Sequence, residues 1–251
     1  MTLASYDWSL VWENRTELLH GLLTALEVSA VALVISVVVG LVLAMARMGK
    51  PPLSWLAVIY INVFRGVPAL VSVIWVYFGL SLVLGINFTV FQAGVIALVL
   101  LYGAFISEIY RAALQAIPHG QREAGLALGM HPMRVFAQVV LPQATKIAIP
   151  NIGSMFIGMV KDTSTFTVIG LLEVVRVTQN LNSTTFQPFV LYTAAAGLYV
   201  LAAFAIDFVF RAIEKALATP PSGRVSKALT HRKRRRLEAV MLRLEALSGR
   251  T

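Results

Sequence analysis

The sequence predicts an all-α protein, an integral membrane bundle of five transmembrane helices. Three observations lead to this prediction. Of the 251 residues, 58% are hydrophobic and only 13% are charged, whereas soluble domains carry about 25% charged residues. Five apolar segments are long enough to cross the roughly 30 Å of hydrocarbon in a bilayer. One compact polar segment, residues 119–138, separates two of these apolar segments.

The five predicted spans differ in regularity. They are Leu22–Met45, Gly66–Leu84, Phe88–Ser107, Pro142–Val160 and Phe189–Phe210. The second follows another apolar stretch, Leu53–Phe64, and is interrupted by Arg65 and Pro68. The fourth contains Lys146 and Pro150. Because irregular backbone persists at membrane depth only where protein or water surrounds it, we expect the fourth span to line the interior of the bundle.

Basic residues near the spans predict the orientation, because they accumulate on the cytoplasmic side of a membrane. One side carries Arg47, Lys50, the basic residues of 111–146 and the basic tail after Arg211, whereas the other carries Arg15, Lys161 and Arg176. We therefore expect an external N-terminal segment (1–17), a five-span transmembrane domain (18–218) and a cytoplasmic basic tail (219–251). The first residues lack a basic start and a small-residue cleavage site, so we expect the first span to be retained.

The polar segment 119–138 is typical of two short helices joined by a turn. We expect the first helix over Gln121–Leu128, after Pro118–His119–Gly120 ends the preceding span. Glu123 is expected in the first turn of this helix, where the helix dipole favours a carboxylate. Gly129 suits the left-handed residue that closes a helix, and Pro132 suits a helix start. The apolar side chains expected to be exposed until a partner covers them are Leu126, Leu128, Met130, Val135 and Phe136.

This segment resembles the cytoplasmic EAA loop of ABC importer permeases. The matching pattern is Glu123-Ala124-Gly125, three residues, Gly129, nine residues, Val139, one residue, and Leu141-Pro142. The family pattern has alanine in place of Gly125 and isoleucine in place of Val139, and a Ser or Asn cap is common where this chain has His131. Further similar stretches are FRGVP (64–68), EIYRAALQAIPHGQREA (108–124), LPQA (141–144), VKDTSTFTVIGLLEV (160–174) and TFQPFVLY (185–192). Over residues 18–215 the chain is similar to permeases for polar amino acids of the histidine/arginine/glutamine type.

The resemblance implies a type I ABC importer permease fold and its partners. Two permeases, identical or paralogous, form the pore, separate ABC ATPase subunits bind the EAA loops, and an extracytoplasmic solute-binding protein delivers the amino-acid substrate. The residues implied in ATPase coupling are Glu123, Ala124, Gly125, Gly129, Leu141 and Pro142. The sequence has no GxxxxGK[ST] phosphate loop, since Gly49-Lys50 is followed by Pro51. We therefore expect this chain not to be an enzyme and to bind no cofactor, ATP and Mg²⁺ being used by the partner ATPase.

Ionisable residues within spans are costly and are candidates for function. The candidate substrate-pathway residues are Arg65, Glu108, Lys161, Asp162, Thr163, Ser164 and Glu173. Glu108 and Arg111 either pair on one helix face or line a cavity, and Arg65 either lines the pathway or reaches the headgroups. The 161–173 cluster either holds a zwitterion at the outer mouth or is a solvated loop with internal ion pairs.

Other polar features have simpler interpretations. Asp207 is expected to pair with Arg211, one helical turn away. With no cysteine, and with four histidines that lack ligand spacing, no metal site is expected. Much of the net charge of +9 lies in the C-terminal tail, where a basic cluster precedes a plausible amphipathic helix. We expect this tail to bind anionic lipids, the alternative being a solvated tail; nucleic acid is not an expected partner.

The predicted function is the membrane permease subunit of an ATP-driven importer for a polar amino acid. Mixed acidic and basic residues leave a related small cation or amine as an alternative substrate. Two other classes remain as alternatives: a non-transporting membrane scaffold, including a non-conducting partner in a heterodimer, and an ion-driven secondary transporter.

Overall fold

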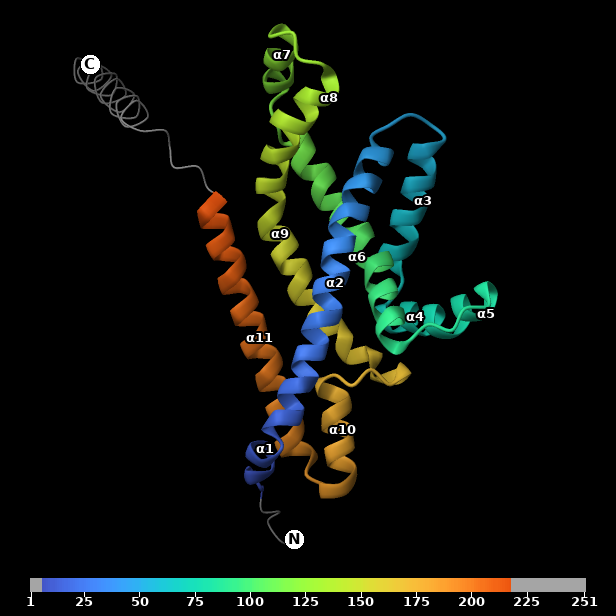
Figure 1. Ribbon diagram of the computed structural model, residues 1–251, viewed down its shortest axis with the longest axis vertical. Coiled ribbons are helices and arrows are strands. Elements are labelled where there is room, and N and C mark those ends of the chain that lie inside the picture. The colour runs from blue at the N-terminus through green and yellow to red at the C-terminus, as the bar shows by residue number, and fades with distance from the viewer. Residues whose placement is uncertain (1–5, 218–251) are drawn as a thin grey trace, which may run out of the picture. The chain divides into compact units, whose positions relative to one another are not determined.

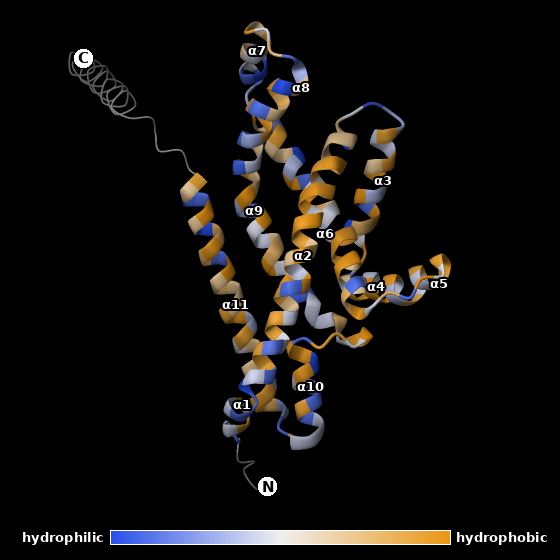
Figure 2. Ribbon diagram, in the orientation of Figure 1, coloured by the Kyte–Doolittle hydropathy of each residue, from blue (hydrophilic) through white to orange (hydrophobic). Residues whose placement is uncertain are grey.

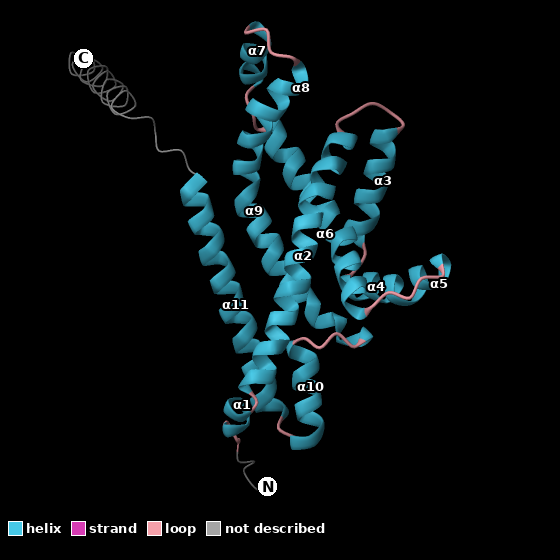
Figure 3. Cartoon of the chain, viewed as in Figure 1, coloured by secondary structure: helices cyan, strands magenta, loops and turns pink. Residues whose placement is uncertain are grey.

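The computed structural model describes residues 6–217, and every regular element in that range is a helix (Figure 3). Two compact units divide at residue 212, and the first of them, 1–212, contains the features discussed below. Three helices in the described range are long and apolar enough to cross a membrane, or up to five spans if each of two sharply bent helix pairs counts as one. The all-α membrane bundle is therefore confirmed. The predicted tail, 219–251, lies outside the described residues.

The centre of the fold is a pair of long helices, α2 (Arg15–Arg47) and α6 (Val90–Gln115), which cross closely (Figure 1). A short helix, α1 (Ser9–Glu13), precedes α2. The buried face of α2 consists mainly of small residues three or four positions apart: Gly21, Ala25, Ser29, Ala32, Ser36, Gly40 and Ala44. In a membrane, small side chains allow helix backbones to approach and gain van der Waals contact, since lipid provides no hydrophobic driving force between helices. The sequence of α2 thus specifies a tight partner on one face and lipid on the other.

The second predicted span, Gly66–Leu84, is broken near its start, at the interruption that the sequence shows around Pro68. The chain forms α3 (Leu53–Gly66), breaks at Val67–Pro68, and continues as α4 (Ala69–Ile74), a π-helical segment (Trp75–Leu80) and α5 (Ser81–Leu84). The two halves meet at 109°, so that α4 and α5 run across the direction of α3 (Figure 1). Pro68 has no amide hydrogen and forces the preceding residue into an extended conformation, seen at Val67 (φ −91°, ψ 129°).

The fourth span is longer than predicted. It runs from α8 (Pro132–Val135) through a π-helical segment (Phe136–Val140) into α9 (Leu141–Asp162), and then tightens into a 3₁₀ helix (Thr163–Ile169). Left-handed Gly170 ends this helix, and α10 (Val174–Thr185) follows at a bend of 48°.

The last helix, α11 (Pro188–Leu217), contains the predicted span Phe189–Phe210. Towards its C-terminal end Phe210 packs on α9, with its ring centroid 6.1 Å from that of Phe156. Apolar residues cover the long helices, whereas polar residues are frequent in the short helices at the two ends of the bundle, α7 (His119–Ala127) and α8 at one end and α10 at the other (Figure 2). The end with α7 and α8 carries the segment that resembles a coupling loop.

Candidate functional site

The first candidate site is the hairpin of α7 and α8. Gly129 adopts the left-handed conformation (φ 77°) and closes α7, and Pro132 occupies the first turn of α8; both predictions are confirmed. The α8 cap is His131, whose Nδ1 accepts a hydrogen bond from the backbone N–H of Met133 at 3.3 Å. The imidazole therefore performs the capping role that Ser or Asn performs elsewhere.

Contact between the two short helices sets the shape of the hairpin. Val135 is completely buried, and a β-carbon at position 125 would lie 2.8 Å from its Cγ2. The close fit explains why glycine replaces alanine in the Glu-Ala-Gly triplet. The expectation that Val135 is exposed was therefore wrong, and Phe136 is half-buried as well, because both side chains turn towards the spans.

The start of α7 also differs from the prediction. The preceding helix α6 ends at Gln115, so Pro118 caps α7 and His119 is its first residue. Glu123 therefore lies beyond the first turn of α7, where the helix dipole acts less on it. The Glu123 side chain is exposed, as are Leu126 and Leu128, the latter by 82%. An exposed carboxylate beside two exposed leucines is a surface suited to a protein partner.

The remaining residues of the coupling motif lie where α9 begins. Leu141 is the first residue of α9 and is half-buried, and Pro142 follows it in the first turn. The π-helical segment that precedes them joins α8 to α9 without a loop. The hairpin is thus continuous with a membrane helix.

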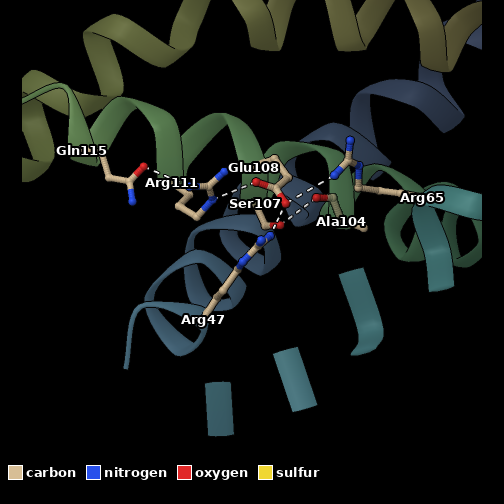
Figure 4. Close-up of polar contacts among 7 residues, drawn as sticks. All are labelled: Arg47, Arg65, Ala104, Ser107, Glu108, Arg111 and Gln115. Carbon is tan, nitrogen blue, oxygen red and sulfur yellow. Dashed lines mark hydrogen bonds and ion pairs between the residues drawn. The ribbon is translucent and has the colours of Figure 1, made fainter. Parts of the chain in front are cut away.

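A second candidate site is centred on Glu108 in α6 (Figure 4). Its carboxylate contacts guanidinium groups from three helices. Arg111 Nε donates to Oε2 at 2.8 Å, Arg65 Nη1 lies 3.3 Å from Oε1, and Arg47 Nη1 pairs with the same Oε1. The predicted pairing of Glu108 with Arg111 is confirmed, and the structure adds Arg47 and Arg65. Three cations around one anion leave a surplus of positive charge where the side chains of Arg47 (α2), Arg65 (α3) and Arg111 (α6) meet.

The third candidate site is a pocket of about 290 Å³ between α4, α6 and α9. Most of its wall is apolar, including Leu101, Phe105 and Met155, but Asp162 also lines it. Tyr102 Oη donates to Asp162 Oδ2 at 2.9 Å, which holds the carboxylate in place. The Arg65 guanidinium lies 5.7 Å from the centre of the Phe105 ring. Asp162 is thus the acidic residue of the pocket wall, whereas Arg65 lies near the wall residue Phe105 without lining the pocket itself.

The structure does not gather the other residues of the 161–173 cluster around this pocket. Lys161 is exposed, whereas Thr163 is buried and its hydroxyl donates to the Val160 carbonyl at 2.7 Å. Ser164 Oγ donates to the Lys161 carbonyl at 2.6 Å. These hydroxyls bond to their own helix, which is common for serine and threonine.

Glu173 has a structural environment that the sequence did not reveal. It is fully buried and caps α10, accepting hydrogen bonds from the backbone N–H groups of Val175 and Arg176, both at 2.8 Å. Tyr199 Oη of α11 donates to it at 2.6 Å. The expectation that Glu173 stands in an open, solvated mouth is wrong, because its oxygens satisfy buried donors.

Comparison with known proteins identifies the family. The sequence model of the "Binding-protein-dependent transport system inner membrane component" family matches residues 36–219. The chain belongs to this family. It is 34% identical to the glutamine transport system permease protein GlnP of Escherichia coli K12 over 212 residues, 84% of this chain and 97% of GlnP. It is equally identical, over the same shares, to the arginine transport system permease protein ArtQ of Bacillus subtilis.

Solved structures support the same fold for this inner membrane component. The crystal structure of an amino acid ABC transporter with histidines matches with a TM-score of 0.76 and 32% identity, covering 86% of this chain and all of the other. An inward-facing MetNI methionine ABC transporter matches with a TM-score of 0.69 at 23% identity, which supports the fold alone. The chain is therefore a multi-pass membrane permease with the fold of an ABC importer.

Sequence reasoning about this permease missed Arg47, Tyr102 and Tyr199. Arg47 was counted only as a basic flank of the first span, although its position at a span end, like that of Glu108, was a usable signal. The two tyrosines carry no local signal, because an aromatic residue within an apolar helix is usually packing. Only the juxtaposition of α6 with α9, and of α10 with α11, shows that each phenol donates to a carboxylate.

Proposed function

We propose that this chain is the pore-forming permease subunit of an ATP-driven importer for a polar amino acid. The observation that carries the proposal is the α7–α8 hairpin, whose exposed Glu123 and Leu128 project from a unit that continues directly into α9. A partner ATPase in the cytoplasm binds this surface and uses ATP and Mg²⁺. Movement of the hairpin then passes into the helix that carries Asp162. The N-terminus lies outside, and an extracytoplasmic binding protein delivers the substrate.

The pocket between α4, α6 and α9 supports the substrate class. Asp162 suits the ammonium of an amino acid, and Arg65, beyond Phe105, suits its carboxylate. Relatives named for glutamine, arginine and L-cystine transport support a polar amino acid. A single carboxylate in an apolar pocket also suits a small amine, and this is the second candidate substrate.

The test is labelled uptake into liposomes that contain the permease, its second copy or paralogue, the ATPase and the binding protein. We expect ATP-dependent uptake of one polar amino acid. Glu123→Arg is expected to abolish both uptake and co-purification with the ATPase. The control is Glu17→Arg, which reverses an exposed charge in the first turn of α2 and should leave co-purification unchanged. Uptake that needs no ATP would indicate a secondary transporter instead.

Asp162→Asn tests the pocket. We expect uptake to fall at least tenfold, because a neutral amide loses the charge attraction for the ammonium, while the ATPase still co-purifies. Lys161→Gln, an exposed neighbour, serves as the control and should retain uptake. A panel of amines separates the two substrate classes: uptake of an amine that lacks a carboxylate, and unaffected by Arg65→Gln, would reject the amino-acid proposal.

A further inference from the structure

A groove of about 570 Å³ lies where α2 and α6 end and α7 begins, away from the pocket that contains Asp162. Its volume is in the range of sites for small organic ligands. One part of its wall is apolar, including Met45, Met48 and Leu114. The other part is polar and contains Gln115, His119 and Arg122. The groove is therefore amphipathic and lies at the level where the membrane helices stop.

The groove attracts anions. Every residue that lines it is neutral or basic, and Arg122 makes no ion pair with a carboxylate in the described part of the chain. Gln115 connects its wall to the Glu108 cluster, since its Oε1 accepts a hydrogen bond from Arg111 Nη1 at 3.0 Å (Figure 4). That cluster holds three guanidinium groups against one carboxylate. The low dielectric of the membrane region leaves this surplus charge weakly screened.

An apolar track leads from the membrane into the groove. On α2 the exposed side chains Val34, Val38, Val42 and Met45 follow one another on a single helical face. Eleven residues of helix span roughly 16 Å, which is close to the length of an acyl chain. A ligand with an extended apolar tail and an anionic head would place its tail on this track and its head beside Arg122.

We propose that this groove binds one anionic phospholipid from the leaflet on the side of the α7–α8 hairpin. Its phosphate contacts Arg122 and His119, and an acyl chain lies along the valine track of α2. Charge complementarity selects the occupant, because a neutral lipid gains the apolar contact but not the attraction to the basic wall. The proposed site uses residues 34–140 and none of the basic residues of 219–251, and it does not depend on which substrate is transported.

The experiment uses the full-length permease complex in nanodiscs of phosphatidylcholine that contain a small fraction of photoactivatable phosphatidylglycerol. Cross-linked peptides are mapped by mass spectrometry, so that binding at the groove is distinguished from binding at the tail. We expect cross-links on the peptides that carry Met45–Met48 and Ile117. Arg122→Gln should reduce these cross-links about fivefold, in line with the contribution of one basic side chain near an anionic leaflet.

Arg134→Gln is the matched control, because Arg134 is an exposed arginine of the same hairpin that does not line the groove. It should leave the groove cross-links unchanged. Met45→Trp, which adds bulk at the groove mouth, should reduce them as Arg122→Gln does. The proposal is overturned if Arg122→Gln has no effect, if photoactivatable phosphatidylcholine labels the groove equally well, or if the bound ATPase abolishes labelling because it covers the groove.

Discussion

Gly125 of α7 lies against Val135 of α8 with no room for a side chain between them, since an added β-carbon would come within 2.8 Å of Cγ2 and 3.1 Å of Cγ1 of the valine. Val135 is completely buried in this contact. This chain has glycine where the EAA pattern has alanine, and Val135 of the same hairpin packs against the glycine where an alanine side chain would lie. The packing fixes how α8 leaves α7 and hence the geometry of the exposed hairpin surface that we propose binds the ATPase.

Gly125→Ala is expected to loosen the hairpin. Alanine favours the helix by about 1 kcal/mol, but overpacking a tight contact costs about 1–3 kcal/mol, so the steric term dominates. Hydrogen exchange of residues 119–135 should accelerate several-fold. Gly120→Ala is the matched control: it lies in the same helix, but its β-carbon meets nothing within 4 Å, so exchange should slow. Adding Val135→Ala to Gly125→Ala should slow hydrogen exchange again. Equal exchange rates in Gly125→Ala and Gly120→Ala would show that the contact between Gly125 and Val135 does not limit the hairpin.

Gly129→Ala is expected to impair coupling more than Gly129→Asn. The left-handed backbone at φ 77° costs a β-carbon-bearing residue about 1–2 kcal/mol, and asparagine tolerates it best. Transport per ATP hydrolysed, measured in liposomes, should fall for the alanine variant and remain near wild type for asparagine. If both variants transport normally, the turn does not set the coupling geometry.

Glu108→Gln is expected to destabilise the permease by about 2 kcal/mol. Breaking a fully buried ion pair costs about 3–5 kcal/mol, and the Glu108 side chain retains 19% exposure, which lessens the cost. The thermal unfolding temperature of the variant in detergent should fall by several degrees. The control is Asp207→Asn: its confirmed pair with Arg211 is far more exposed, so the shift should be small. Normal thermal stability with lost uptake would instead assign Glu108 to the substrate pathway.

Glu173→Ala is expected to lower stability without changing substrate affinity. The variant loses the cap of α10, worth about 1–2 kcal/mol, together with the Tyr199 hydrogen bond. Tyr199→Phe removes only the latter and should cost less. The KM for uptake should stay within about twofold of wild type, because the buried carboxylate is saturated by protein donors. A large rise in KM at unchanged stability would instead place Glu173 in a substrate mouth.

Much of the fold was predictable, because its signals are local. Apolar length predicted the long helices, Gly129 and Pro132 predicted the turn and the start of α8, and the Asp207–Arg211 pair followed from helical spacing. Pro68 marked an interruption of the second apolar stretch, but not the 109° turn that carries α4 and α5 across α3. The direction of the chain after a break depends on what the next segment packs against, which no local pattern contains.

The sequence by itself determined that this protein is a helical membrane permease with a polar hairpin that matches the EAA pattern, because hydrophobic length, turn residues and motif spacing act between neighbours in the chain. Only the tertiary structure decided which polar side chains share a partner. Arg47, Arg65 and Arg111 meet at Glu108, Tyr102 holds Asp162, and Glu173 caps α10 rather than facing a ligand. Such contacts join helices that are far apart in sequence. The close approach of α2, α6 and α9 in space brings the interacting side chains within reach of one another.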